Sequence, residues 1–322
     1  MVKFFYGGMN VEVKQMYTAF GLTIESELRL PELIYMENQE MPDVLVQFKN
    51  LAETWANHFP EDGFGYIRPN LFLFKIDHVA IFQVLDGRFI HIHPLLGANI
   101  DQIRLYVLGT CFGAILIQRN VLPLHGSAVV IDGEAYGIVG NSGAGKSTLA
   151  SAFVQRGYEL VTDDVMAIRF HSDHTPFISP AYPQQKLWEQ SLTQFGMEAR
   201  KLQPIVNRES KYFVPIARFH ENPVPLKGIF ELNIGEELQS VTMENCNKLE
   251  KIHKLLKHTY RNYLLEPSGL MGWHFKQSTK LASQIQMYEL TRPRLRFTTD
   301  ELVEMILTEI RKGEGLCHRE LV

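Results

Sequence analysis

The chain has 322 residues and a formal net charge of −4 at pH 7, and 45% of its residues are hydrophobic and 21% charged. This is the composition of an ordinary globular protein, long enough for two modest domains or one large domain. Because the net charge is slightly negative, it provides no electrostatic basis for binding nucleic acid. The three cysteines lack the spacing of a disulfide framework or a CxxC metal site, so we expect a reducing compartment.

Alternating apolar and polar residues predict strands in the first part of the chain. The runs LTIESELRL and VLVQFK have the period of two that a half-buried strand requires, and LDG is a turn signal. We therefore predict a small β-rich module over residues 1–100 and a larger domain over residues 101–322.

The most apolar run, LYVLGTCFGAILI, covers residues 105–117. It is too short to cross a bilayer and predicts a buried helix. The first residues, MVKFFYGGMNVEVKQ, lack the sustained apolar core of a secretory signal. These observations lead us to expect a soluble, cytoplasmic protein that does not bind membranes.

Two further helices are predicted towards the C-terminus. The first is the charged stretch NKLEKIHKLLKHTYRNYLL, and the second is TTDELVEMILTEIRKG, which has apolar residues at helical spacing. In the second stretch, Thr298 and Glu301 have the spacing of a capping box, which predicts that the helix begins there.

The stretch GIVGNSGAGKSTLA, residues 137–150, contains a phosphate-binding pattern. Gly140, Gly145, Lys146 and Ser147 satisfy G-x-x-x-x-G-K-S/T. The glycines let the backbone turn with its N–H groups pointing inward, the lysine reaches the terminal phosphates, and the serine hydroxyl ligates Mg²⁺. An ordinary glycine-rich turn is the alternative, but here a strand precedes the pattern and a helix follows it.

The helix that follows would direct the positive end of its dipole at the phosphates and would end at Gly157. We therefore predict a nucleotide-binding loop. Its expected phosphate contacts are Gly140, Asn141, Ser142, Gly143, Ala144, Gly145, Lys146, Ser147 and Thr148.

The strand that enters this loop is predicted to belong to a β-hairpin. SAVVIDGEAYGIVG is a strand, an Asp-Gly turn and a second strand. Most P-loop enzymes instead enter the motif from a parallel sheet with crossover helices. The hairpin therefore distinguishes this chain from the P-loop enzymes whose motif follows a strand of such a parallel sheet.

Two adjacent carboxylates, Asp163 and Asp164, follow the loop helix in GYELVTDDV. We expect a parallel strand to return them to the phosphate site, with only one of the two facing the nucleotide, because side chains alternate along a strand. Phosphoryl transfer uses one carboxylate to accept the proton of the attacking hydroxyl and another to hold metal or orient partners. A turn or a helix cap is the alternative interpretation. His125, at the base of the hairpin, is a further catalytic candidate, although a lone histidine is more often structural.

The stretch His125–Val165 resembles the catalytic core of the bacterial HPr kinase/phosphorylases, whose fold is shared with phosphoenolpyruvate carboxykinase. The histidine, the loop and the acidic pair occur in the same order and at similar separations. The resemblance implies a mixed α/β fold with a P-loop kinase core and C-terminal helices over residues 101–322. It also implies that His125 assists charge stabilisation, that Lys146 and Ser147 bind phosphates and Mg²⁺, and that Asp164 accepts the proton of a serine hydroxyl.

Outside this core the resemblance is weaker. The family's glutamate for the metal has no clean copy, and Glu189 in YPQQKLWEQ lies at about the right distance. Arg208 or Lys211 in NRESKYFVPI is placed to contact the transferred phosphate, or else belongs to a solvated basic loop. The stretch YTAFGLTIESELRLPEL resembles shorter HPr-kinase-like proteins, some encoded with lasso-peptide biosynthesis enzymes. For these the implied substrate is the C-terminal serine of a precursor peptide.

The sequence as a whole predicts an ATP- and Mg²⁺-dependent kinase that acts on a serine of a peptide or small protein. Two alternatives remain open: a small-molecule kinase built on the same core, and a nucleotide-binding regulator that transfers nothing. Because HPr kinases are hexameric, the resemblance also implies self-association into a homo-oligomer.

Overall fold

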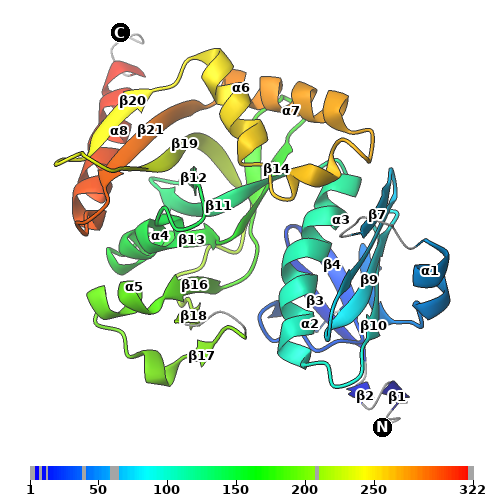
Figure 1. Ribbon diagram of the computed structural model, residues 1–322. Helices are drawn as coiled ribbons and strands as arrows, with labels where there is room; N and C mark the ends of the chain where they lie inside the picture. The colour runs from blue at the N-terminus through cyan, green and yellow to red at the C-terminus, as the bar shows by residue number, and fades with distance from the viewer. Residues whose placement is uncertain are drawn as a thin grey trace.

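The computed structural model describes residues 4–6, 9–11, 14–37, 41–58, 65–206 and 210–317. Two eight-stranded sheets and the helices packed on them form most of the molecule (Figure 1). The mixed α/β fold class predicted from the sequence is confirmed.

The N-terminal sheet has the strand order β5-β3-β4-β6-β10-β9-β8-β7. The predicted strands LTIESELRL and VLVQFK correspond to β4 and β6, and the LDG turn joins β9 to β10 through Asp86 and Gly87, both with positive φ. A short helix, α1 (Ala52–Asn57), and a separate pair, β1 (Phe4–Tyr6) with β2 (Met9–Val11), accompany the sheet. The strands are β3 (Gln15–Ala19), β4 (Leu22–Ser26), β5 (Ile34–Tyr35), β6 (Val44–Phe48), β7 (Gly65–Arg68), β8 (Leu71–Ile76), β9 (Ala80–Leu85) and β10 (Phe89–Pro94).

A continuous helical segment packs on this sheet. It consists of α2 (Ile100–Tyr106), a π-helical turn η1 (Val107–Cys111) and α3 (Phe112–Gln118). The segment is longer than the thirteen residues expected, and by length and composition it is the one candidate membrane span in the described part of the chain. Because 67% of it is buried within the protein, the expectation of a buried helix holds, although the argument from length was wrong.

The helical segment stands between the N-terminal sheet and the second half of the chain (Figure 1). Its apolar residues share one hydrophobic cluster with that sheet and with residues of the second half, such as Tyr182, Tyr260 and Leu264. This core thus extends well beyond residue 100. The division into domains at residues 100 and 101 stays a prediction.

The second large sheet contains the predicted hairpin. β11 and β12 pair antiparallel, and Asp132 and Gly133 at the turn both have positive φ, as a two-residue hairpin turn requires. β12 also pairs in parallel with β19, which pairs in parallel with β21. The path β11-β14-β15-β19 leads back to β12, so these strands close on one another. The strands are β11 (Leu122–Ile131), β12 (Glu134–Gly140), β13 (Glu159–Thr162), β14 (Val165–Phe170), β15 (Pro176–Ser179), β19 (Val224–Gly235), β20 (Thr242–Asn245) and β21 (Gln286–Pro293).

The expectation that a parallel strand follows the loop helix is wrong. Both β13 and β14 pair antiparallel with β11, one after the other along the same edge. The chain therefore returns beside the first hairpin strand and not beside the strand that enters the phosphate loop.

The remaining elements surround this sheet. α4 follows β12 and ends before Gly157, whose φ of 98° is that of a helix C-terminal glycine, as predicted. A small sheet contains β16, β18 and β17 in that order. The elements are α4 (Lys146–Gln155), β16 (Gln184–Trp188), α5 (Glu189–Gln194), η2 (Ala199–Lys201), β17 (Gln203–Pro204), β18 (Lys211–Pro215), α6 (Lys248–Lys257), η3 (Asn262–Leu264), α7 (Met271–Gln284) and α8 (Thr299–Cys317).

The two predicted C-terminal helices form and begin where the sequence predicts, at Lys248 and Thr299. The capping box predicted at Thr298 and Glu301 is absent, because the Thr298 hydroxyl is buried without a hydrogen-bond partner and Glu301 pairs with Arg296 at 2.8 Å. A capping box does begin α6, where Asn247 and Glu250 bond reciprocally. The first predicted stretch is helical only to Lys257, after which the chain turns.

Glycines in two helices offer a matched test of the contact between α3 and the second half. A Cβ at Gly113 would lie 2.7 Å from the buried ring of Tyr260, whereas a Cβ at Gly272 would meet nothing within 4 Å. We expect Gly113→Ala to lower the unfolding free energy by about 1–3 kcal/mol through overpacking. Gly272→Ala should leave it unchanged or raise it by up to about 1 kcal/mol. Urea unfolding measures both, and equal stability of the two variants would contradict the packing described.

Candidate active site

The phosphate-binding pattern forms a loop between β12 and α4. Gly140, Gly143 and Gly145 have φ values of 151°, 84° and 109°, and a Cβ at Gly140 would lie 2.4 Å from the carbonyl oxygen of Leu232. Only glycine fits these backbone conformations and this close approach without strain. The Lys146 ammonium donates to the main-chain carbonyl oxygens at Gly140 (2.9 Å) and Asn141 (3.1 Å). The loop is thus built with its lysine folded over it.

A single cavity of about 830 Å³ opens over this loop. Of the nine predicted phosphate contacts, all but Ala144 line it; the Ala144 carbonyl instead accepts a hydrogen bond from the Arg292 guanidinium at 2.9 Å. Helix α2 and the π-helical turn η1 form part of its wall, so both halves of the chain contribute to it. Its cationic side chains are Lys146, Lys186, Lys211, Lys257, Arg261, Arg292, Arg294 and Arg296.

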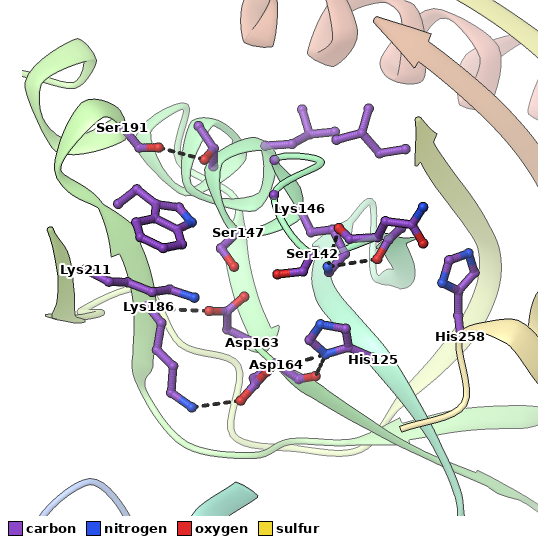
Figure 2. Close-up of a pocket in the computed structure, with 18 of the residues that line it drawn as sticks. His125, Ser142, Lys146, Ser147, Asp163, Asp164, Lys186, Ser191, Lys211 and His258 are labelled. Atoms are coloured by element: carbon purple, nitrogen blue, oxygen red, sulfur yellow. Dashed lines mark hydrogen bonds and ion pairs between the residues drawn. The ribbon is translucent and has the colours of Figure 1, made fainter. Parts of the chain in front are cut away.

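The carboxylates that line the cavity are Asp163 and Asp164, so the cavity wall carries a large excess of positive charge. This positive charge suits a ligand with several negative charges, such as a nucleoside triphosphate. Figure 2 shows the two carboxylates between Lys146 and Lys186.

Both members of the acidic pair face the cavity, which corrects the expectation that only one would. The residues lie in a break between β13 and β14, where the Val165 N–H donates to the Asp163 carbonyl at 3.0 Å across a three-residue turn. Asp164, at the centre of this turn, has φ +74°, a conformation that is strained for a residue with a side chain. Because the turn interrupts the strand geometry, side chains no longer alternate there. Strain of this kind concentrates at functional sites.

Several hydrogen bonds hold the turn in place. The Ser127 hydroxyl donates to Asp163 Oδ1 at 2.5 Å, and the main-chain N–H of Lys186 donates to Asp163 Oδ2 at 3.0 Å. The Lys186 ammonium pairs with Asp164 Oδ2 at 2.7 Å. Burial alone would raise the pKa of the Asp164 carboxyl, but the Lys186 ammonium holds that pKa well below its usual range. Asp164 is therefore ionised at neutral pH.

His125, the catalytic candidate at the base of the hairpin, lies directly against Asp164. Its Nδ1 is 2.9 Å from the Asp164 main-chain carbonyl oxygen and 3.4 Å from Asp164 Oδ1. Because both oxygens are acceptors, Nδ1 carries a proton. Burial lowers the pKa of His125, although the Asp164 carboxylate opposes this, so the imidazole is neutral at pH 7. The histidine thus supports the acidic turn as a hydrogen-bond donor.

A buried charge cluster beside the loop was not anticipated from the sequence. Glu231, fully buried on β19, pairs with Lys254, with Lys257 at 2.9 Å and with His258 at 2.6 Å, and Lys254 also pairs with Glu289. Burial would raise the pKa of Glu231, but hydrogen bonds from His258, Lys254 and Lys257 hold it well below its usual range. No motif marks this cluster, since its members come from three separate elements.

The cluster reaches the active site through the main chain. His258 lines the cavity, and its main-chain carbonyl oxygen accepts a hydrogen bond from the main-chain N–H of His125 at 2.7 Å. Glu231 therefore anchors the segment against which the base of the hairpin is held.

The predicted metal ligands differ in their placement. Ser147 lines the cavity at the first turn of α4, where its hydroxyl fits a Mg²⁺ ion bound to nucleotide phosphates. Glu189 is exposed at the start of α5 and does not line the cavity. No group of three or more His, Cys, Asp or Glu side chains in the described ranges could hold a metal. The proposed role of Glu189 therefore gains no support from the geometry.

The two basic candidates of the following loop also differ. Lys211 lines the cavity, with its ammonium 5.3 Å from the centre of the Trp188 ring. Arg208 lies outside the described residues. Lys186 is a basic residue that sequence reasoning missed, because its contacts with Asp163 and Asp164 join two segments that are more than twenty residues apart in the chain.

Comparison with known proteins connects the chain to one enzyme family. It is 44% identical over 54 residues to the HPr kinase/phosphorylase of Lachnoclostridium phytofermentans, which is 17% of this chain and 18% of that protein. It is 38% identical over 85 residues to that of Halalkalibacterium halodurans, 26% of each chain, and 35% identical over 91 residues to that of Lacticaseibacillus casei, 28% of each chain. The predicted similarity to this family is confirmed, over less than a third of each relative's length.

No protein-family profile matches the chain. The solved structure of the HPr(Ser) kinase/phosphatase from Coxiella burnetii matches with a TM-score of 0.34 and 13% identity, over 62% of this chain and 96% of that chain. A score this low establishes no common fold. The family similarity therefore rests on the aligned sequence segments.

The buried charge cluster yields a stability prediction. Glu231→Gln should lower the unfolding free energy at pH 7 by about 3 kcal/mol, because it leaves buried cations without their counter-charge. The pKa of Glu231 is lower in the folded than in the unfolded state, so its contribution is complete above the unfolded value of roughly 4.3 and is lost as the pH falls through the folded value.

Urea unfolding at pH 7 and pH 3 measures this effect. The difference between wild type and Glu231→Gln should shrink at the lower pH. Glu244→Gln, at an exposed glutamate, is the control and should change stability by less than about 0.5 kcal/mol. A Glu231→Gln deficit of equal size at both pH values would contradict the ionised cluster.

Proposed function

We propose that this protein is an ATP- and Mg²⁺-dependent kinase that transfers a phosphoryl group to a serine hydroxyl of a peptide or small protein. The observation that carries the proposal is that the phosphate loop with Lys146 and the acidic pair line one strongly cationic cavity. Phosphoryl transfer needs these two kinds of groups, cations to neutralise phosphate charge and a carboxylate to accept a proton. The sequence similarity to HPr kinase/phosphorylases supports a kinase activity.

In this proposal the chain's own residues position the reactants. The loop N–H groups and the N-terminus of α4 bind the phosphates, and Lys146 leaves its carbonyl partners to neutralise them. Mg²⁺ on Ser147 would supply further neutralisation when bound. Asp164 accepts the proton of the attacking hydroxyl as the new oxygen–phosphorus bond forms and the bond to the leaving ADP oxygen breaks. His125 keeps the turn at Asp164 in place.

We infer the acceptor of the phosphoryl group from the resemblance of the N-terminal stretch to other proteins. The similarity of the N-terminal stretch to HPr-kinase-like proteins of lasso-peptide clusters suggests the C-terminal serine of a precursor peptide. Helix α2 and the turn η1 line the cavity, and we propose that the acceptor binds against them. We place the reaction in the cytoplasm, without nucleic acid or membrane as partner, and propose that the protein self-associates as HPr kinases do.

Incubating the protein with ATP, Mg²⁺ and the peptides encoded beside its gene, followed by mass spectrometry, tests this function. A phosphate added to a peptide serine is the expected result. Phosphorylation of a free metabolite in place of any peptide would identify a small-molecule kinase. Nucleotide binding without any transfer would overturn the proposal in favour of a regulator.

Replacing the proposed proton acceptor separates chemistry from binding. Asp164→Asn should lower the transfer rate by about 10²- to 10⁴-fold and leave ATP affinity within about threefold, because the carboxylate acts on the acceptor hydroxyl. Lys146→Ala should instead weaken both transfer and ATP binding, since its ammonium neutralises phosphates in both states. Calorimetric ATP titration and initial rates measure the two effects. Retained activity in Asp164→Asn would remove the residue from its assigned role.

A further inference from the structure

Lys186 contacts both members of the acidic pair. Its main-chain N–H donates to Asp163 Oδ2 and its ammonium pairs with Asp164 Oδ2, at 3.0 and 2.7 Å. The contact is shielded from water, since the Lys186 side chain is only 12% exposed and the Asp164 side chain 23%. Among the cationic residues of the cavity, Lys186 thus carries a direct ion pair with the proposed proton acceptor.

The carboxylate oxygens of the pair have protein donors close by. Asp163 Oδ1 accepts from Ser127 and Oδ2 from the Lys186 main chain, while Asp164 Oδ2 accepts from the Lys186 ammonium and Oδ1 lies 3.4 Å from His125. A divalent cation on these oxygens would sit beside a fixed ammonium, and the like charges would repel. The acidic pair is therefore a poor second metal site.

Many phosphoryl-transfer enzymes neutralise the moving phosphoryl group with two divalent ions. Here Ser147 offers one such position, while Glu189, the other expected ligand, does not line the cavity. We infer that the Lys186 ammonium takes the place of a second metal ion, so that the nucleotide-loaded protein holds one divalent cation and Lys186 supplies the second positive charge. The contribution of Lys186 to phosphoryl transfer, the catalytic half of this inference, rests on the proposed kinase function. The number of bound divalent cations does not.

The ion pair gives Lys186 a role during transfer. Before reaction its charge is balanced by Asp164. When the acceptor hydroxyl gives its proton to Asp164, that carboxylate becomes neutral, and the ammonium is left without its counter-charge, with the Asp164 side chain between it and the phosphate loop (Figure 2). The positive charge thus becomes available as the acceptor oxygen binds phosphorus and ADP departs, and Asp164 later loses its proton to solvent. Lys186 thus supplies a positive charge that is uncompensated only while transfer takes place.

A metal count tests the inference without turnover. Mn²⁺ is titrated into the protein with a non-hydrolysable ATP analogue, and bound ions are counted by electron paramagnetic resonance. We expect one Mn²⁺ per chain in the wild type and in Lys186→Arg, which keeps the charge. Lys186→Met removes the charge and should admit a second Mn²⁺ at the acidic pair. Lys211→Met, at another cavity lysine, should still bind one.

Two Mn²⁺ ions in the wild type would overturn the inference, as would a folded Lys186→Met variant that still binds one. Thermal unfolding shows whether each variant is folded, and Lys186→Gln replaces Lys186→Met if the latter is not. A wild type that fails to bind the analogue contradicts the proposed kinase instead, so the two failures are distinguishable.

Kinetics test the catalytic half. Lys186→Met should lower kcat by about 10²- to 10³-fold, as loss of one charge-stabilising group does, with KM for ATP changed less than about threefold. Lys186→Arg should recover at least about a tenth of the lost rate, because it restores the charge. Equal losses in the two variants, or a loss confined to KM, would show that Lys186 only supports the fold of the site.

Discussion

The candidate active site depends on the turn at Asp163 and Asp164. This turn places two adjacent carboxylates on the same side of the chain, which a regular strand cannot do. It is strained at Asp164 and is held by Ser127 of the hairpin, Lys186 of β16 and His125. The fold therefore maintains an unfavourable backbone conformation through contacts from two other strands, β11 and β16, as is common at sites of chemistry.

The rest of the structure brings charge to that turn. The hairpin supplies both the phosphate loop, at the end of β12, and His125, near the start of β11. The buried Glu231 cluster fixes His258, whose carbonyl holds the His125 main chain. Arg261, which also lines the cavity, donates to the Thr110 hydroxyl of η1 at 2.8 Å and ties the helical segment α2–η1–α3 to the cavity. One cavity thus combines residues from distant parts of the chain.

The sequence predicted the features that local chemistry determines. The phosphate loop, the Asp-Gly hairpin and the glycine end of α4 are each set by a few adjacent residues. The prediction that only one of the two carboxylates faces the cavity was wrong. Side chains alternate only where the backbone has regular strand dihedral angles, and Asp164 does not have them. The capping box at Thr298 failed because an ion pair with Arg296, five residues earlier in the chain, engages its glutamate, Glu301.

Lys186 and Glu231 were missed for a different reason. Each acts through partners more than twenty residues away, and a lone lysine or glutamate in a strand has no pattern that identifies it. Their roles follow from tertiary contacts, which sequence periodicity does not give.

A crystal structure with a non-hydrolysable ATP analogue and Mg²⁺ would show how the nucleotide lies relative to the acidic pair. The proposed mechanism requires that the terminal phosphate lies in the cavity against the Lys146 ammonium, with the Asp164 carboxylate facing it across a space open to an incoming hydroxyl. A nucleotide bound away from the phosphate loop, or an Asp164 carboxylate turned from the terminal phosphate, would contradict it.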